Sequence, residues 1–388
     1  MSQSKLSPIL KWAGGKEGEL KYILPNLPTQ FIRFIEPFVG GGAVYFSIKS
    51  KCKLINDKSE DLINFYLQVQ KNPSTLATQL QELQTIWKNL EQFLHANLNF
   101  FQQTYIEYKQ GSITDFSLQQ RIKQFIEEKL HNCSFLLGKE LYKKQEKFKE
   151  ILNKTSIEKI KRMKCLEDKK GDLPISDLFD NFESILKASF YTLIRDLYNH
   201  NPLQNAQYFY FIREYCYSSM FRYNSKGEFN VPYGGISYNK KNFQRKIDYI
   251  LSSALQKHLK QTQIYNLDFE EFLNKINLQK DDFIFLDPPY DTDFCTYSNN
   301  TFDKIDQERL SRYLIHKCPS KFMLIIKNTP FIKNLYSHRG LYIQSFDKKY
   351  MVSFKGRNKR DTEHLLITNY PLQKIINPKT IKQRSLKS

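Results

Sequence analysis

The strongest chemical signal in the sequence is the run Asp287-Pro288-Pro289-Tyr290, which directly follows the apolar segment 283–286. A loop that leaves the carboxyl end of a buried strand lies where open α/β sheets bind ligands. The two prolines remove two N–H donors, so the loop presents carbonyl oxygens, a carboxylate and an aromatic ring. These groups suit a planar ligand with an amino group, such as a nucleobase flipped out of a duplex. The alternative is a simple turn that ends the strand, and it leaves this choice of residues unexplained.

A second candidate is the glycine-rich segment 34–44, FIEPFVGGGAV, at the first expected strand–helix turn. Nucleotide-like cofactors pack against bare backbone at such turns. The segment lacks both the GK[ST] of a phosphate-binding loop and the GxGxxG spacing of a dehydrogenase. Asp57 ends the next expected strand, 17 residues after Gly40, where a carboxylate can accept hydrogen bonds from ribose hydroxyls.

A third candidate lies near the start of the chain, where Trp12 stands beside two glycines and Lys16 in the segment 11–16, KWAGGK. An aromatic ring, a glycine pair and a lysine suit a compact lid over a charged cofactor. A surface turn explains the same residues equally well. The three candidates therefore depend on the elements that position them.

The elements around these segments predict an α/β fold. Residues 43–50 are expected to begin a helix, and a second helix is expected between Phe302 and His316 with Asp303 as its N-cap. Strand, turn, helix and strand in this order are typical of a doubly wound sheet. Buried strands are expected at five apolar segments: 31–35, 53–56, 283–286, 322–327 and 364–370.

The composition indicates a globular protein with a polyanionic partner. Hydrophobic residues make up 40% and charged residues 26%, which excludes a mostly disordered or collagen-like chain. Lysine and arginine total 59 against 40 acidic residues, a formal charge of +19. This excess favours nucleic acid, although a solvated basic surface also explains it. Scattered cysteines and histidines, and the absence of a signal peptide or membrane span, predict a cytoplasmic protein without a metal site.

The stretch 68–207 has a different character, with almost no glycine and with Leu, Gln, Lys, Glu and Phe at helical spacing. We expect a helical insertion whose charged faces are solvated. An arm that clamps DNA is the less favoured alternative.

Four motifs in order resemble the Dam-like family of DNA adenine N6 methyltransferases, in its alpha arrangement: KWAGGK (11–16), FxEPFxGGGAV (34–44), NDxxxxLINxY (56–66) and DPPY (287–290). The resemblance covers roughly 1–67 and 208–370. It implies a Rossmann-like methyltransferase sheet with an inserted helical and target-recognition domain. It also implies S-adenosylmethionine as cofactor, double-stranded DNA as partner and methylation of the N6 amino group of a flipped adenine.

The resemblance assigns expected roles to individual residues. Asp287 and the Pro288 carbonyl would accept hydrogen bonds from the adenine amino group, and Asn328 would lie near the target base. The expected catalytic loop is Asp287, Pro288, Pro289 and Tyr290. The expected cofactor-binding residues are Trp12, Lys16, Glu36, Gly40, Asp57 and Asp287.

The segment 215–235 is similar to the target-recognition hairpin of the family, FRYNxxGEFNVPxG. Ser218 and Ser219 replace the more usual Asn and Gly, and Gly235 stands where some members have arginine, so the target sequence stays open. In this hairpin Arg222 matches a base-reading arginine, Tyr217 an aromatic that enters the duplex, and Pro232 a residue that packs at the groove. The remaining expected DNA-binding residues are Asn224, Lys226, Asn230 and Arg357, the last in a basic turn near the C-terminus.

Three other functions compete with this interpretation. A cytosine amino-methyltransferase is disfavoured by Asp287, where serine is common. An RNA adenine methyltransferase is disfavoured by the DNA-type hairpin. A non-catalytic DNA-binding regulator is disfavoured by the intact Asp287 and Tyr290.

The expected organisation is a catalytic domain over 1–67 and 264–372, a helical insertion over 68–207, a recognition region over 208–263 and a basic tail over 373–388. A monomer is expected. Whether a restriction endonuclease acts on the same site stays open.

Overall fold

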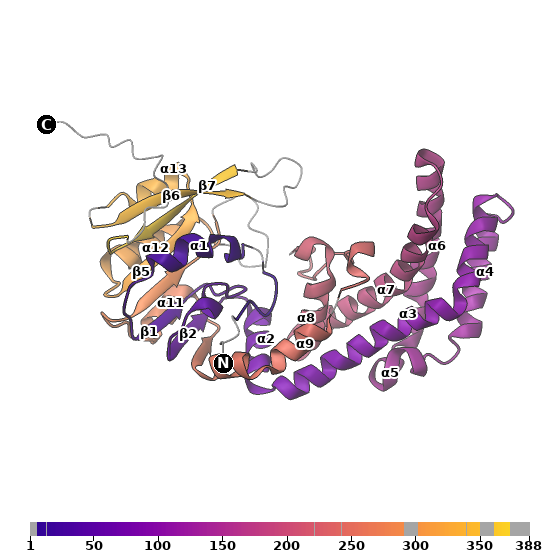
Figure 1. Cartoon of the computed structure of the whole chain (residues 1–388), viewed down its shortest axis with the longest axis horizontal. Helices are drawn as coiled ribbons and strands as arrows, with labels where there is room; N and C mark the ends of the chain where they lie inside the picture. Colours follow the sequence, from indigo (N-terminus) through magenta and orange to yellow (C-terminus); the bar gives the residue numbers. More distant parts are fainter. Residues whose placement is uncertain are drawn as a thin grey trace. The chain divides into compact units, whose positions relative to one another are not determined.

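The computed structural model describes residues 6–12, 14–220, 222–241, 243–290, 302–338, 340–349 and 361–372. The chain divides into two compact units, one of Met1–Gln70 with Ser253–Ser388 and one of Lys71–Ser252 (Figure 1). Over the described ranges, no helix is both long enough and apolar enough to cross a membrane.

The first unit is built on a seven-stranded sheet with the order β3-β2-β1-β4-β5-β7-β6. Strands β1 to β5 run parallel, whereas β7 is antiparallel to β5 and β6 is antiparallel to β7. This is a mixed sheet of the methyltransferase kind. The strands are β1 (Arg33–Glu36), β2 (Cys52–Asn56), β3 (Thr262–Tyr265), β4 (Phe283–Leu286), β5 (Lys321–Lys327), β6 (Tyr342–Lys349) and β7 (Asp361–Thr368).

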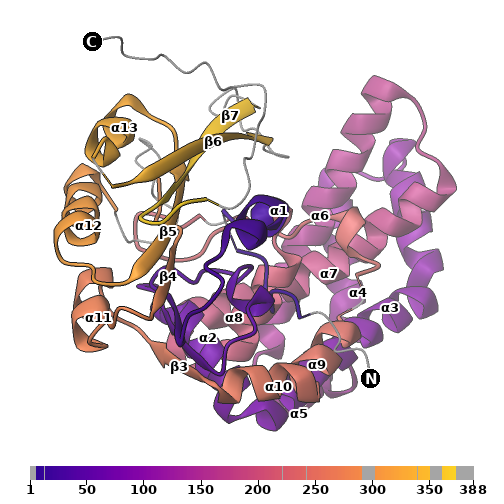
Figure 2. The ribbon, with the colours of Figure 1, turned by 60° about the vertical axis from the view of Figure 1, so that its left-hand side comes forward.

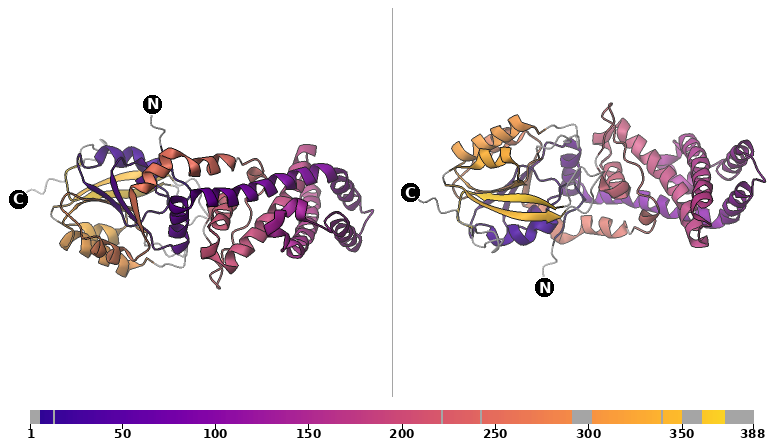
Figure 3. Two further views of the ribbon diagram at one scale, coloured as in Figure 1. Left: turned by 90° about the horizontal axis from the view of Figure 1, so that it is seen from below. Right: turned by 90° about the horizontal axis from the view of Figure 1, so that it is seen from above.

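Helices cover both sides of this sheet. α11 (Phe269–Lys275), α12 (Lys304–His316) and α13 (Pro330–Tyr336) lie along one side, and α1 (Leu20–Ile23) lies on the other (Figures 2 and 3). Apolar residues of α11–α13 share one core with Ile284, Leu324 and other strand residues. α2 (Glu60–Lys71) follows β2, and α10 (Ser253–Lys260) precedes β3. The continuous burial of β4 explains why its sequence is apolar throughout.

The five expected strands are present, and Asp303 caps α12 in a reciprocal capping box with Asp306. The prediction that a helix begins at 43–50 is wrong, because this segment forms only a 3-10 turn, Tyr45–Ser47. Tyr45 and Phe46 are buried, and Tyr45 shares a hydrogen bond with Thr262, so the segment packs inward as a compact turn. The first full helix between strands is α2, after β2.

The second unit is helical over its described residues. Its longest helix, α3, is kinked at Asn97, where the backbone leaves the helical region. The helices are α3 (Pro73–Lys109), α4 (Asp115–Lys129), α5 (Ser134–Tyr142), α6 (Gln145–Lys170), α7 (Ile175–His200), α8 (Ala206–Tyr215) and α9 (Gln244–Leu251), with 3-10 turns at Pro202–Gln204, Tyr217–Ser219 and Ile236–Tyr238.

The expected recognition region 208–263 contains a helix as well as the paired segment expected over 215–235. Residues 208–215 belong to α8, whose aromatic side chains Phe209, Tyr210, Phe211 and Tyr215 are buried and therefore cannot stack on bases. Antiparallel pairing runs through the segment expected as the hairpin, with bridges between Cys216 and Tyr233 and between Tyr223 and Phe229. Backbone hydrogen bonds extend it, from the Gly234 N–H to the Tyr215 carbonyl at 2.9 Å and from the Asn230 N–H to the Arg222 carbonyl at 3.0 Å. β3 also lies in this region, and it pairs with β2 in the sheet of the first unit.

Candidate active site

Three carboxylates lie at the carboxyl ends of neighbouring parallel strands. Glu36 is the last residue of β1, Asp57 follows β2, and Asp287 follows β4. Because β2, β1 and β4 are adjacent and parallel, these ends share one edge of the sheet. This is the edge where open α/β sheets bind ligands.

Lys16 joins this edge from the N-terminal segment. Its side chain is only 3% exposed, and Nζ lies 2.5 Å from Asp287 Oδ2. The same ammonium donates to the hydroxyl of Tyr290 at 2.9 Å and to the carbonyl of Gly14 at 2.9 Å. A buried lysine is costly unless its charge is paired and its donors are used. Lys16 therefore ties the N-terminal segment to the DPPY loop.

Glu36 is a buried carboxyl with unused hydrogen-bonding capacity. It is 2% exposed, and its Oε2 has no hydrogen-bond partner within the described part of the chain. Burial, and then the nearby charge of Asp287, raise its pKa well above the usual value. A buried polar atom without a partner is expensive, so this oxygen is suited to a ligand that brings an N–H donor.

Asp57 and Trp12 lie around the glycine turn. The Gly40 N–H donates to Asp57 Oδ2 at 3.0 Å, and the Ser59 N–H donates to Oδ1 at 2.9 Å. Burial raises the pKa of Asp57 to about 6 despite these bonds. Gly40 has φ +49, and a Cβ there would lie 2.8 Å from Trp12 Cδ1. Glycine is therefore required for the close approach of the Trp12 ring.

Gln307 is a residue at this site that the motifs did not single out. It is fully buried on α12, and its Nε2 donates to the Pro289 carbonyl at 2.8 Å. This hydrogen bond connects the DPPY loop to α12. Within the loop, Pro288 is buried and Pro289 is exposed. The sequence offered one signal for this role of Gln307, namely a glutamine on the buried face of the helix that was expected after the loop.

His364 and Asn328 complete the surroundings. The buried ring of His364 lies edge-on to Tyr290, with 5.2 Å between the ring centroids. Asn328, expected near the target base, donates through its side chain to Glu363, and its backbone N–H donates to the Glu363 carbonyl at 2.9 Å. The structure therefore gives Asn328 a partner on β7.

All of the expected DNA-recognition residues except Arg357 lie in the second unit. Tyr217 is 46% exposed, and Lys226 and Pro232 are exposed too. The exposed Arg222 donates from Nε to Asn230 Oδ1 at 2.7 Å and from one Nη to the Asn230 carbonyl at 3.0 Å. Asn224 donates to Glu228 Oε2 at 2.7 Å. Arg357 lies outside the described residues, as does the rest of the basic turn between β6 and β7.

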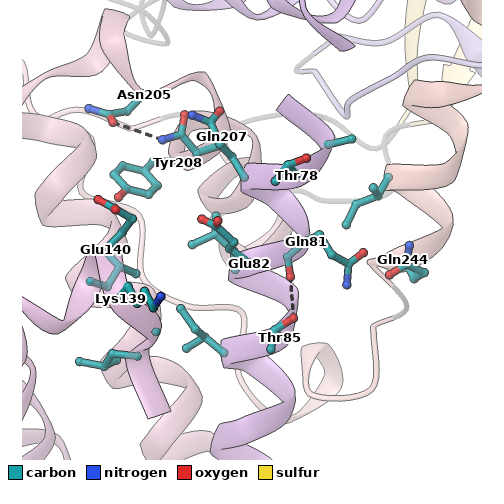
Figure 4. Close-up of a pocket in the computed structure, with 18 of the residues that line it drawn as sticks. Thr78, Gln81, Glu82, Thr85, Lys139, Glu140, Asn205, Gln207, Tyr208 and Gln244 are labelled. Carbon is teal, nitrogen blue, oxygen red and sulfur yellow. Dashed lines mark hydrogen bonds between the residues drawn. The ribbon is translucent and has the colours of Figure 1, made fainter. Parts of the chain in front are cut away.

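The second unit also has a groove of 1060 Å³ between α3, α5, α8 and α9 (Figure 4). Glu82, Glu140 and Tyr208 line it, and none of the residues expected from the motifs does. Burial, and then the two glutamates, raise the pKa of Tyr208. All of the residues that line the groove belong to the second unit.

A model of the D12 class N6 adenine-specific DNA methyltransferase family matches residues 12–172 and 160–353. The chain belongs to this family. The resemblance to Dam-like enzymes is thereby confirmed, and the protein is an adenine-specific DNA methyltransferase that acts on N6.

Curated relatives agree with this family. The type II methyltransferase M.CviBI of Paramecium bursaria Chlorella virus NC1A is 25% identical over 370 residues, which cover 94% of this chain and all of that protein. The type II methyltransferase M.MjaIII of Methanocaldococcus jannaschii is 27% identical over 384 residues, with the same coverage. The DNA adenine methylase of Serratia marcescens is 28% identical over 195 residues, 47% of this chain and 67% of that protein. The first two matches extend over most of the helical unit.

Proposed function

We propose that this methyltransferase takes its methyl group from S-adenosylmethionine, bound at the edge formed by Glu36, Asp57 and Asp287, and transfers it to an adenine held by the DPPY loop. The observation that carries the proposal is the meeting of three carboxylates at neighbouring strand ends, with Lys16 buried against one of them. Two of these carboxylates suit the cofactor, and the third suits the base.

The residues at this edge fit the chemical groups of the cofactor. Glu36 Oε2, buried and without a partner within the described residues, would accept a hydrogen bond from the α-ammonium group. Asp57 would accept from the ribose hydroxyls, and Trp12 would cover the glycine turn. When bound, S-adenosylmethionine supplies a methyl group on a sulfonium, which is an electrophile.

The DPPY loop would hold the amino group of adenine. Its nitrogen is a poor nucleophile, because the lone pair is delocalised into the ring. Asp287 and the Pro288 carbonyl would accept hydrogen bonds from its two N–H groups, which favours a tetrahedral nitrogen with a directed lone pair. As the nitrogen gains the methyl group and the cofactor leaves as a neutral thioether, the nitrogen would lose one proton, for which the Asp287 carboxylate is the nearby acceptor. Lys16 orients the Asp287 carboxylate and stabilises its charge. Catalysis would then rest on positioning and electrostatics.

The segment 217–232, which carries the exposed Tyr217 and Arg222, would read the target site. Arg222 suits the two acceptors of a guanine edge, and Tyr217 would enter the duplex from which the adenine is flipped. Asn224, Lys226, Asn230 and Pro232 lie on the same segment. Since two relatives that match along their full length are named type II methyltransferases, we also propose a modification role paired with an endonuclease of the same site.

The test compares Asp287→Ala with Asp281→Ala, which removes an exposed carboxylate six residues earlier. Both variants are incubated with duplex DNA and S-adenosylmethionine that carries a labelled methyl group. We expect Asp287→Ala to lose transfer by about 10²–10³-fold or more, and Asp281→Ala to keep it. Mass spectrometry of the digested DNA should find label only in N6-methyladenine. Label in N4-methylcytosine, or equal transfer by both variants, would contradict the proposal.

A further inference from the structure

The turn that carries Tyr217 has a strained backbone. Ser218 and Ser219 both have φ +51, and within the described residues Asn277 is the one other non-glycine with positive φ. An L-residue pays for this left-handed conformation, and glycine, asparagine and aspartate tolerate it best. The family pattern has Asn and Gly at these two positions, whereas this chain has two serines. Such strain persists only where surrounding contacts impose it.

Arg213 supplies one set of these contacts. Its side chain projects from α8 and is 1% exposed. One Nη donates to the Met220 carbonyl at 2.7 Å, and the other donates to the Ser219 carbonyl at 3.0 Å. The guanidinium carbon also lies 5.7 Å from the centre of the Phe229 ring. A planar fork can hold two adjacent carbonyls in a fixed geometry, which a lysine ammonium cannot do.

Tyr238 supplies a second contact, through the N–H of Ser218, which donates to the Tyr238 hydroxyl at 3.1 Å. The Tyr238 ring reaches this position because residue 234 is glycine, where a Cβ would lie 2.3 Å from the ring. Lys241 Nζ lies 4.8 Å from the ring centre and helps to fix the ring. The preceding residue, Tyr217, donates its N–H to the Pro232 carbonyl at 2.9 Å.

We propose that Arg213 and Tyr238 are specificity-determining positioning residues, which hold the Tyr217–Met220 turn in its left-handed form so that Tyr217 and the following Arg222 meet the DNA. Neither acts on the reacting atoms. Asn and Gly at positions 218 and 219 would favour the left-handed backbone conformation by themselves. In this chain the tertiary contacts of Arg213 and Tyr238 stabilise that conformation in two serines. The inference rests on the proposed role of this segment in reading the target site. If the turn relaxes, contacts to the correct site are lost while background binding to other sequences is kept, so selectivity falls.

The test uses the full chain with two mild substitutions. Tyr238→Phe removes only the hydroxyl, and Arg213→Lys keeps the charge but loses the fork. Tyr108→Phe is the matched control, because it loses one tyrosine hydrogen bond, to Asp115, on helices that do not form this turn. Methylation is measured on the mapped site and on its single-base variants, and binding of S-adenosylmethionine is measured by calorimetry.

We expect both substitutions to lower kcat/KM for the correct site about tenfold, with a smaller loss on the variant sites and unchanged affinity for S-adenosylmethionine. Tyr108→Phe should match the wild type. The decisive comparison uses a triple variant, in which Ser218→Asn and Ser219→Gly are combined with Tyr238→Phe. Because Asn and Gly adopt the left-handed turn without help, selectivity should return.

The outcomes separate this inference from the proposed function. If the wild type methylates adenine at a defined site but Tyr238→Phe keeps full selectivity, the inference is overturned and the proposed function stands. An unselective Tyr238→Phe that the Asn–Gly pair does not rescue also overturns it, since the turn is then not the cause. If the wild type methylates no DNA, both fall together. Should Arg213→Lys fail to fold, Tyr238→Phe and its rescue still decide.

Discussion

Lys16 Nζ lies 2.5 Å from Asp287 Oδ2, although the two residues are 271 positions apart in the sequence. Lys16 is 3% exposed and Asp287 is 19% exposed, so the pair is largely shielded from water. The contact fastens the N-terminal segment, with Trp12, onto the loop that follows β4. One ion pair thus joins the N-terminal segment to the DPPY loop.

Removal of the lysine should therefore affect both stability and activity. Lys16→Met leaves the Asp287 carboxylate without its cation, and we expect a loss of about 2 kcal/mol in the free energy of unfolding, below the value for a fully buried pair because Asp287 is partly exposed. Urea denaturation measures this loss. Adding Asp287→Asn should restore part of the stability but none of the activity. A double variant no more stable than Lys16→Met would show that the ion pair does not couple the two residues.

The motifs located the three carboxylates because Glu36, Asp57 and Asp287 each stand at the end of a strand. The apolar run before Asp287 and the two prolines after it indicate a strand and its end from the local sequence alone. The structure places β4 there. The pairing of Lys16 with Asp287 could not be predicted in this way. It depends on how a segment without regular secondary structure folds back, which no local pattern encodes.

The aromatic run at 208–215 shows the opposite case. Its residues suit a base-stacking strand as well as a buried helix, and only packing against the other helices selects α8. Likewise, the prediction of a helix at 43–50 was based on local propensity alone. In the structure Tyr45 and Phe46 are buried, and the segment forms only a short 3-10 turn.

Asp57 should give cofactor binding a pH dependence. Burial raises its pKa to about 6, so the carboxylate proposed to accept hydrogen bonds from the ribose hydroxyls forms as the pH rises through 6. We expect the affinity for S-adenosylmethionine to increase over that interval in the wild type. Asp57→Asn should bind more weakly and lose the inflection near pH 6. Calorimetry between pH 5 and 8 measures both curves, and an inflection that survives in Asp57→Asn would assign it to another group.

The same raised pKa predicts an effect on stability with a definite sign. Below the unfolded pKa the carboxyl is protonated in both states. Between about pH 4 and 6 the unfolded chain ionises first, so this group costs up to about 2–3 kcal/mol of stability as the pH rises. Asp57→Asn should remove that loss. Unfolding curves at pH 4 and pH 7 measure it, and an equal change in both proteins would exclude Asp57 as the source.

Gln307 should act as a positioning residue for the DPPY loop. Gln307→Leu removes the hydrogen bond to the Pro289 carbonyl, and we expect kcat to fall about tenfold because a small displacement of the loop misaligns the amino group. KM for S-adenosylmethionine should stay unchanged. Glu308→Leu, on the exposed face of the same helix turn, is the control. Single-turnover methylation separates the chemical step from product release, and a fall in cofactor affinity instead of rate would reassign Gln307 to the cofactor site.

Arg222 should read one base, whereas Lys226 should contact a phosphate. The Arg222 guanidinium is oriented by two hydrogen bonds to Asn230, and this orientation suits a directed contact with a guanine edge. Lys226 is exposed at the tip of the same segment, and its ammonium can serve any sequence. Arg222→Ala should cost about 1–3 kcal/mol on the correct site and relax selectivity at one position. Lys226→Ala should weaken all sites alike and reduce the salt dependence of binding. Methylation rates on a panel of single-base variants distinguish the two roles, because a common factor for every site in Arg222→Ala would mark that arginine as a phosphate contact.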